Sequence, residues 1–282
     1  MPGIKDFKNK VLVITGAASG IGKATAKAFA LEGADVVIAD NNAQRLEETA
    51  KEIQATGARV LAKQLDVSER KQVDSFAGTV MTERGHVDIL INNAGVGVGG
   101  PLLDTSIEDY EWIFSVNYWG VLYGLKAFLP HMVSRKYGHV VNIASGAGLC
   151  SIPAMSAYCS TKFAVVGLSE TLRSEMRRFG IGVSTICPGI INTNIVAQSR
   201  MHLQDNIKAS HKTLVNFYSR FGWPPERVAK AILSAVRRNR SIVPVGPEAW
   251  AQWFTKRISQ KFFDAMNEAS GRYFMTAKKG EG

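Results

Sequence analysis

One stretch near the N-terminus constrains the fold more than any other, because a short apolar run enters a glycine-rich turn that opens a helix. The run is Val11–Ile14, the turn Thr15–Gly22 has the sequence TGAASGIG, and a helix is predicted over Gly22–Leu31. Glycine lets the backbone turn tightly and approach a pyrophosphate, which the N–H groups of the helix N-terminus can bind. The glycine spacing is not the more familiar Gly-x-Gly-x-x-Gly, so the flanking strand and helix distinguish this stretch from a plain glycine-rich turn.

The rest of the chain repeats the alternation of short β-branched runs with longer helical stretches. Strands are predicted over Val11–Ile14, Val36–Ala39, Val60–Leu65, Ile89–Asn92, Val140–Ala144, Val183–Cys187 and Ile242–Pro244. The other helices are predicted over Gln44–Ala55, Glu69–Glu83, Ile107–Val133, Ser156–Phe179 and Pro225–Arg238. Apolar strands this short, separated by helices, indicate a parallel sheet covered on both faces. We therefore predict an α/β fold, a doubly wound parallel seven-stranded sheet (Rossmann fold) in three α/β/α layers.

No break in composition marks a domain boundary. We predict one domain over residues 1–247, with a substrate loop at about 190–223 where periodicity is weak, and an amphipathic C-terminal extension over 248–282. The apolar stripe of the extension has near-helical spacing and consists of Trp250, Trp253, Phe254, Ile258 and Phe262. Three interpretations of this stripe stay open: a helix packed on its own core or a sister subunit, a lid on the pocket, and a membrane-surface helix.

The net charge of +10 is concentrated in one window. Between Arg200 and Arg240 nine Lys and Arg residues, Lys208 among them, stand against two acids, Asp205 and Glu226. A solvated basic face is the favoured interpretation, with an anionic substrate or a membrane surface as alternatives. Nucleic acid is not expected as a partner, because the chain carries none of the known binding motifs.

The cysteines and the apolar segments of the sequence indicate the cellular compartment in which the chain is expected. Cys150, Cys159 and Cys187 form neither a disulfide framework nor a zinc site, so we expect buried free thiols and no metal. No stretch approaches the roughly 20 apolar residues of a membrane helix, and no secretory signal is present. We therefore expect a cytoplasmic protein.

An acidic residue follows the glycine-rich turn at the spacing expected for a ribose ligand. Asp40 ends the second predicted strand, 18 residues after Gly22. Its carboxylate can hold both hydroxyls of an adenosine ribose and would repel a 2′-phosphate. The neighbouring positions Ser19 and Asn41 are not basic, so nothing there favours that phosphate. The predicted cofactor is NAD(H) rather than NADP(H), and a turn residue at a strand end is the alternative role of Asp40.

A tyrosine and a lysine provide the predicted proton chemistry. Tyr158 and Lys162 are four residues apart in a predicted helix and therefore share one face. The phenol has an ordinary pKa of about 10, and a nearby ammonium favours the phenolate. Ser145 follows the fifth predicted strand, at the sheet edge where ligands bind, so its hydroxyl can hold a substrate oxygen against Tyr158. The Tyr-x-x-x-Lys spacing alone is common on helix surfaces, so the prediction depends on the whole combination.

Several motifs in order make the chain resemble the short-chain dehydrogenase/reductase family, in its standard single-domain branch, over about residues 8–245. They are TGAASGIG, LDV at Leu65–Val67, NNAG at Asn92–Gly95, Asn117, Ser145, YCSTK at Tyr158–Lys162, and PGIINT at Pro188–Thr193. The predicted cofactor contacts in the glycine-rich turn are Gly16, Ser19, Gly20, Ile21 and Gly22. The resemblance implies that Asp66 and Val67 flank the adenine and that Asn93 lies beside the adenosine ribose. It also implies that the nicotinamide carboxamide is held by Pro188, Ile191 and Thr193.

The resemblance further implies that Lys162 holds the nicotinamide ribose and that Asn117 anchors a water that relays protons to Lys162. Because asparagine is a mediocre helix former, Asn117 within Ile107–Val133 could instead be a packing accident. The reaction that follows is hydride transfer between nicotinamide and an alcohol or ketone, with Tyr158 as acid and base. The resemblance also leads us to expect a homodimer or homotetramer.

The expected pocket walls are Val96, Val98, the segment Ala147–Met155 and the loop Ile190–Trp223. Their apolar side chains are Leu149, Ile152, Pro153, Met155, Ile195, Val196, Met201, Leu203, Phe217 and Phe221. This composition favours a lipophilic substrate, while the basic loop keeps an acyl thioester open. Two other functions on the same fold are a non-catalytic NAD(H)-binding sensor or scaffold, and an epimerase or dehydratase; the latter is less favoured because it usually needs a larger substrate domain.

Overall fold

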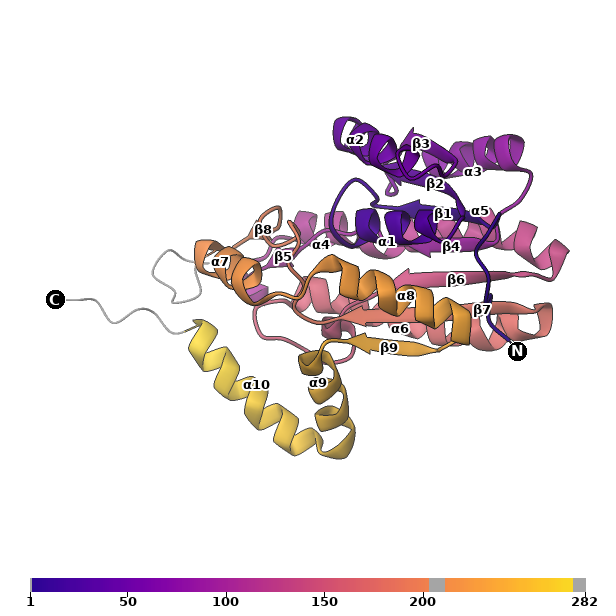
Figure 1. Cartoon of the computed structure of the whole chain (residues 1–282). Helices are drawn as coiled ribbons and strands as arrows, with labels where there is room; N and C mark the ends of the chain where they lie inside the picture. The colour runs from indigo at the N-terminus through magenta and orange to yellow at the C-terminus, as the bar shows by residue number, and fades with distance from the viewer. Residues whose placement is uncertain (1, 203–210, 276–282) are drawn as a thin grey trace.

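Seven strands form one parallel sheet in the computed structural model, which describes residues 2–202 and 211–275 (Figure 1). In chain order the strands are β1 (Val11–Thr15), β2 (Asp35–Asp40), β3 (Val60–Gln64), β4 (Ile89–Asn92), β6 (Gly138–Ile143), β7 (Ile181–Pro188) and β9 (Ile242–Val245). Their spatial order is β3-β2-β1-β4-β6-β7-β9, and every neighbouring pair is parallel. The strand order reverses between β1 and β4, where open sheets of this kind bind ligands. The predicted fold class is confirmed.

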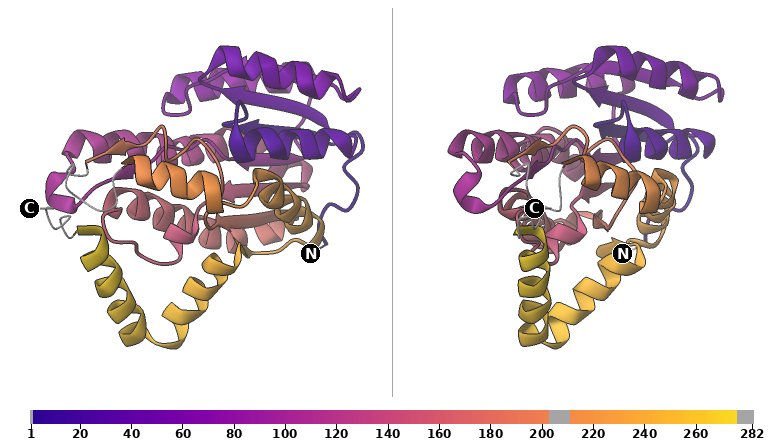
Figure 2. Two further views of the ribbon diagram at one scale, coloured as in Figure 1. Left: turned by 60° about the vertical axis from the view of Figure 1, so that its left-hand side comes forward. Right: turned by 90° about the vertical axis from the view of Figure 1, so that its left-hand side faces the viewer.

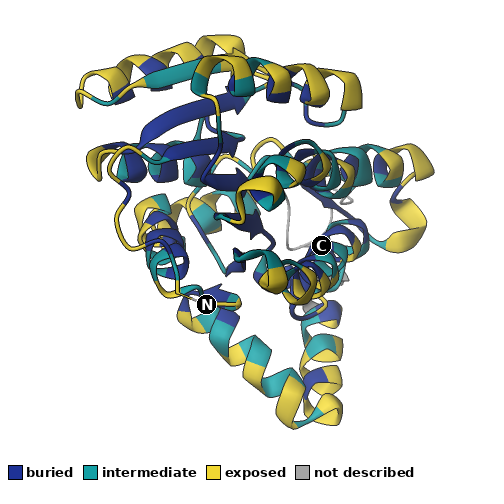
Figure 3. Ribbon diagram, turned by 90° about the vertical axis from the view of Figure 1, so that its right-hand side faces the viewer, coloured by how far each residue is buried: buried dark blue, intermediate teal, exposed yellow. Residues whose placement is uncertain are grey.

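Strand position in the sheet explains which runs are uniformly apolar. All residues of β1, β4, β6 and β7 are buried, whereas β3 at the sheet edge is partly exposed (Figure 3). Central parallel strands lose water on both faces because helices cover each side. The ends of the seven strands differ from the sequence prediction by no more than two residues.

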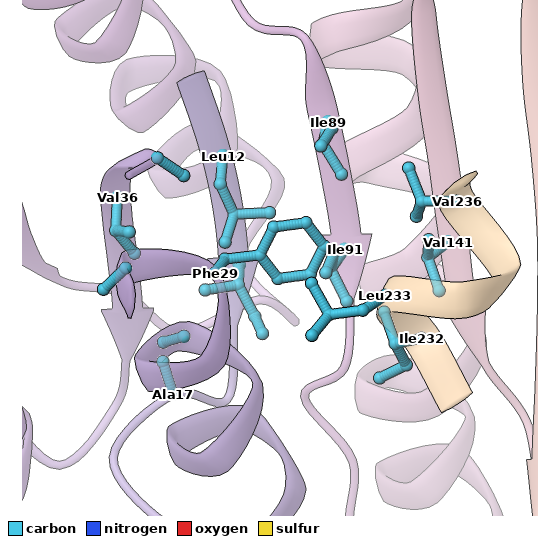
Figure 4. Close-up of a cluster of buried hydrophobic side chains, with 14 of the residues drawn as sticks. Leu12, Ala17, Phe29, Val36, Ile89, Ile91, Val141, Ile232, Leu233 and Val236 are labelled. Atoms are coloured by element: carbon cyan, nitrogen blue, oxygen red, sulfur yellow. The ribbon is translucent and has the colours of Figure 1, made fainter. Parts of the chain in front are cut away.

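Two helical layers enclose the sheet. One cluster of buried side chains packs α1 (Gly20–Leu31), α2 (Ala43–Gln54) and α8 (Pro225–Arg238) on one face. In it, Phe29 of α1 lies among Leu12, Ile91 and Leu233 (Figure 4). A second cluster packs α3 (Arg70–Arg84), α5 (Gly120–Arg135) and α6 (Ser156–Met176) on the other face. The three-layer prediction agrees with this arrangement.

The long helix predicted over Ile107–Val133 is interrupted. It consists of α4 (Ile107–Phe114), a π-helical turn η2 (Ser115–Trp119) and α5. π-helical turns inside helices are rare and concentrate at functional sites. The predicted helical periodicity is correct, but nothing in the sequence pattern indicated the π-helical turn, whose central residue is Asn117.

The segment predicted as a loop at about 190–223 contains regular structure. A short strand β8 (Arg200–Met201) pairs with β5 (Val98–Gly99), and a helix α7 (His211–Phe221) follows. Apolar residues at Leu214, Phe217, Tyr218 and Phe221 carry the helical spacing that could have predicted α7. No residue of α7 is fully buried, and Phe217 and Phe221 of its apolar stripe are exposed.

The C-terminal extension forms two helices, α9 (Pro247–Ile258) and α10 (Gln260–Met275), that meet at Ser259. They form a V that projects from the body of the molecule (Figure 2). Of the predicted stripe, Phe254, Ile258 and Phe262 are at least half exposed, whereas Trp250 and Trp253 are partly buried. In the described part of the chain, no helix combines the length and apolar character that crossing a bilayer requires.

Candidate active site

The glycine-rich turn joins β1 to α1 in a conformation that requires its glycines. Gly16 has φ +66° and Gly20 φ +51°, in the left-handed region that side chains disfavour. A Cβ atom on Gly22 would lie 2.0 Å from the carbonyl oxygen of Gly16. The first turn of α1 carries no acidic residue, and Ser19 precedes the helix as its N-cap. The turn therefore presents open backbone and the positive end of a helix, which fit a pyrophosphate.

Asn93 ties the end of β4 to this turn. Its Nδ2 donates hydrogen bonds to the carbonyl oxygens of Thr15, at 3.0 Å, and Gly16, at 2.9 Å. Its backbone N–H donates to Thr15 Oγ1 at 3.1 Å. The side chain thus shapes the turn, a structural role that the sequence analysis did not assign to it.

Two carboxylates lie at or just after the ends of strands β2 and β3, at the carboxyl edge of the sheet. Asp40 Oδ2 accepts from the Ala18 N–H at 3.0 Å, and Oδ1 accepts from Asn42 N–H at 2.9 Å. Asp66 Oδ1 accepts from both N–H and Oγ of Ser68, at 2.9 and 2.7 Å. The next residue, Val67, is buried against the start of α5. Hydrogen bonds therefore fix both carboxylates, and Asp40 is joined directly to the glycine-rich turn.

The π-helical turn places Asn117 between two elements. Its Oδ1 accepts from the Val96 N–H at 2.8 Å, and its Nδ2 donates to the Val96 carbonyl at 3.0 Å and to Thr161 Oγ1 at 3.2 Å. The residue is fully buried. Asn117 therefore links the segment after β4 to helix α6, which carries Tyr158 and Lys162.

Helix α6 brings the tyrosine and lysine together. Lys162 Nζ lies 5.6 Å from the ring centroid of Tyr158 and donates to the Ile143 carbonyl at 3.2 Å. A Cβ atom on Gly95 would lie 3.2 Å from Asn117 Oδ1 and 3.4 Å from Lys162 Nζ, so the glycine leaves room where these two side chains approach. The predicted residues thus gather at the carboxyl ends of β4 and β6.

Burial shifts the proton affinities of this group. It lowers the pKa of Lys162 to about 8, because the ammonium loses its hydration. Burial raises the pKa of Tyr158, because there the charged form that loses its hydration is the deprotonated phenolate, while a hydrogen bond with the Ser145 side chain lowers it. In the protein alone, therefore, the phenol keeps its proton at neutral pH and most of Lys162 is charged.

The segment Pro188–Thr193 is held from three sides. Gly189 N–H donates to the Val245 carbonyl of β9 at 2.8 Å, and Ile190 N–H donates to Glu248 Oε1 at 2.8 Å. Trp223 N–H donates to the Ile190 carbonyl at 2.9 Å, after α7. Pro188 and Ile191 are buried, and Thr193 Cγ2 would lie 3.1 Å from a Cβ on Gly20. The segment therefore reaches the glycine-rich turn. Sequence reasoning missed Glu248, which holds it.

A charged cluster anchors residues 200–202, within the segment 190–223 that was predicted as a substrate loop. Asp109 of α4 pairs with Arg200 at 2.8 Å and with His202 at 2.5 Å. The hydrogen bond from Arg200 is the main cause of the lowered pKa of Asp109. The Arg200 guanidinium also lies 3.7 Å from the Trp112 ring centroid. Sequence reasoning missed this cluster because its members are far apart along the chain.

The structure changes the interpretation of two residues in the basic window between Arg200 and Arg240. Arg200 is paired with a carboxylate, and Arg227 lies 3.9 Å above the ring of Trp223, so these two are not simply a solvated face. Lys208 and Asp205, and Leu203 of the expected pocket wall, lie outside the described residues. The three cysteines are free and buried, as expected.

Comparisons with known proteins give one consistent result. The sequence model of the short chain dehydrogenase family matches residues 10–204. The chain is 40% identical over 257 residues to the probable oxidoreductase EphD of Mycobacterium tuberculosis, covering 89% of this chain and 43% of EphD. It therefore spans less than half the length of that relative. It is also 34% identical over 261 residues to estradiol 17-beta-dehydrogenase 11 of Homo sapiens, covering 92% of this chain and 86% of that protein.

Among solved structures, a short chain dehydrogenase/reductase from Burkholderia phymatum in complex with NAD has a TM-score of 0.85 to this chain at 33% identity. The match covers 92% of this chain and 96% of that one.

Proposed function

The chain belongs to the short-chain dehydrogenase/reductase family of oxidoreductases, and from that premise we propose that it moves a hydride between NAD and a secondary alcohol or ketone. The observation that carries the proposal is the gathering of Asn117, Ser145, Tyr158 and Lys162 at the sheet edge beside the glycine-rich turn. A protein that only binds the dinucleotide, as a sensor or scaffold, has no need of this group.

The residues present fit a dinucleotide. The glycines of the turn leave the backbone bare, and the adjacent helix end carries no carboxylate that would repel a phosphate. Asp40 would hold the adenosine ribose and disfavour NADP. The remaining proposed contacts are Ser19, Ile21, Asp66, Val67, Asn93, Pro188, Ile191 and Thr193. When bound, nicotinamide supplies or accepts the hydride and, when oxidised, adds a positive charge to the site.

The proton steps belong to the side chains of this chain. In reduction, Tyr158 donates its phenolic proton to the substrate oxygen; in oxidation, it removes the proton of the alcohol. The Ser145 hydroxyl holds that oxygen in place, and the Lys162 ammonium stabilises the phenolate. Asn117, which bonds to the residue next to Lys162, fixes the position of α6.

A lipophilic substrate is favoured by the apolar residues of the segments that are expected to flank it. Leu149 and Val98 are buried, and Ile152, Pro153 and Met155 belong to the segment that precedes Tyr158. Arg200 is engaged with Asp109, which removes one cation that an acyl thioester would need. Similarity to an estradiol dehydrogenase also supports a bulky, apolar alcohol as the substrate.

The test is a turnover assay with NAD+ or NADP+ and a panel of hydrophobic secondary alcohols, with the matching ketones and NADH in reverse. Tyr158→Phe is expected to lose nearly all turnover and keep NADH affinity, because the ring stays while the proton donor is removed. Turnover above about a tenth of wild type in this variant would contradict the role of Tyr158. Tighter binding of NADP(H) than NAD(H) would contradict the role of Asp40.

We also propose a homodimer or homotetramer, as is common in the family. Light scattering at several protein concentrations measures the mass directly, and a monomer at every concentration would contradict this.

A further inference from the structure

Glu248, which the sequence analysis did not assign to the site, contacts the Pro188–Thr193 segment that is proposed to hold nicotinamide. Glu248 is the second residue of α9, and its Oε1 accepts from the backbone N–H of Ile190 at 2.8 Å. The two residues are 58 positions apart. A carboxylate bonded to a backbone N–H forms a charge-assisted hydrogen bond, which is stronger than one between neutral groups.

Two glycines leave the room that this carboxylate occupies. A Cβ atom on Gly189 would lie 2.1 Å from Glu248 Oε1, and one on Gly246 would lie 2.4 Å from it. Gly246 also has φ +105°, a conformation that favours glycine. The main chain on both sides therefore closes around Glu248, so its position and that of the Pro188–Thr193 segment are mutually fixed.

The same helix contacts the other wall of the site. Gln252 Oε1 and Ala249 Cβ lie 3.5 and 3.7 Å from where a Cβ on Gly146 would be, next to Ser145. Helix α10 continues the contact, because Asn267 Nδ2 donates to Ser151 Oγ at 2.9 Å. The C-terminal extension thus touches both segments that flank the proposed nicotinamide position.

We propose that Glu248 is a positioning residue for the nicotinamide half of the cofactor, and that α9 is therefore a working part of the site rather than an appendage. Glu248 acts through Ile190: it fixes the backbone between Pro188 and Thr193, which then presents its groups to the carboxamide. This inference rests on the proposed function, since it takes the location of nicotinamide from it.

The test separates the two halves of the cofactor by calorimetric titration with NADH and with ADP-ribose, which lacks nicotinamide. Glu248→Ala is expected to raise the Kd of NADH about tenfold, the usual loss for a hydrogen bond to a charged group. The Kd of ADP-ribose is expected to stay unchanged. General loosening of the fold would weaken both ligands alike.

Two further variants separate reach from charge. Glu248→Asp keeps the charge at the helix end but withdraws the carboxylate from Ile190, so it is expected to behave like Glu248→Ala. Glu248→Gln keeps an acceptor oxygen in place, so its NADH Kd is expected to stay within about threefold of wild type. These two also serve if Glu248→Ala does not fold.

The matched control is Glu226→Ala. Glu226 also follows the proline that begins a helix, α8, but it is exposed, and among the described residues no hydrogen bond or ion pair joins it to the Pro188–Thr193 segment. It is expected to change neither Kd. Equal weakening of NADH and ADP-ribose in Glu248→Ala, or no weakening of NADH, would overturn the inference while the proposed function stands. Wild-type protein that binds neither ligand would overturn the proposed cofactor site and the inference together.

Discussion

The two sides of the site are constructed differently. On the cofactor side, the turn from Thr15 to Gly22 depends on its own backbone, with glycines where a side chain would collide, and Asn93, 77 residues after Gly16, adds hydrogen bonds to it. On the substrate side, the decisive contacts join distant positions. Asp109 and Arg200 are 91 residues apart, and Ser151 and Asn267 are 116 residues apart.

This difference determines how each side responds to mutation. A backbone turn packed against its own chain cannot accept an added atom without moving as a whole. A pair of side chains from distant elements can be separated while each element keeps its own fold. We therefore expect large effects on all functions from the first side, and smaller, selective effects on substrate from the second.

Gly22→Ala is expected to have the largest effect. The added Cβ would lie 2.0 Å from the Gly16 carbonyl oxygen, so the turn must shift. We expect NADH affinity to fall by about a hundredfold or more and the free energy of unfolding to drop by roughly 1–3 kcal/mol. Calorimetric titration and urea denaturation measure the two quantities.

Gly78→Ala is the matched control, because Gly78 also lies in a helix, α3, and a Cβ there would meet nothing within 4 Å. It is expected to raise stability by up to about 1 kcal/mol, since alanine is the better helix former. If both variants kept wild-type NADH affinity, the turn would not be the rigid element that the comparison requires.

The same difference explains what the sequence could predict. Tyr158 and Lys162 lie on one face of α6 because helical spacing dictates it, and the turn before α1 follows from its glycines. The π-helical turn at Asn117 could not be predicted, because its hydrogen bonds depend on Val96 and Thr161 from other elements. Glu248 was equally hidden, since an acid in the first turn of a helix is common for its interaction with the helix dipole alone.

Asp109→Ala separates the substrate side from the cofactor side. It removes the partner of Arg200 and His202, so residues 200–202 lose their side-chain anchor on α4. We expect KM for the alcohol to rise several-fold with NADH affinity unchanged, and the free energy of unfolding to fall by about 1.5–3 kcal/mol. Steady-state kinetics and denaturation measure this, and an equal loss of NADH affinity would break the comparison.

The stability difference between Asp109→Ala and wild type also has a predicted pH dependence. The folded protein lowers the pKa of Asp109 below its ordinary 3.8, so the unfolded state binds the proton more readily. The stabilisation is therefore complete above that ordinary value and is lost as the pH falls through the lowered one. Urea titrations at several pH values would show the two proteins converging in acid, and a constant difference would contradict the assigned cause.

Asn267→Ala is expected to have the smallest effect and tests how far the substrate side extends. Asn267 is the hydrogen-bond link from α10 to Ser151, in the segment that leads to Tyr158, and its contact is exposed. We expect KM for the alcohol to rise by no more than about threefold, and the free energy of unfolding to fall by less than about 1 kcal/mol. Gln260→Ala is the control, because the Gln260 side chain donates a hydrogen bond within α10 itself, to Asp264. Asn267→Ala could instead lower kcat by as large a factor as Asp109→Ala raises KM. The C-terminal extension would then affect the catalytic step itself, and the substrate side would be as rigid as the glycine-rich turn.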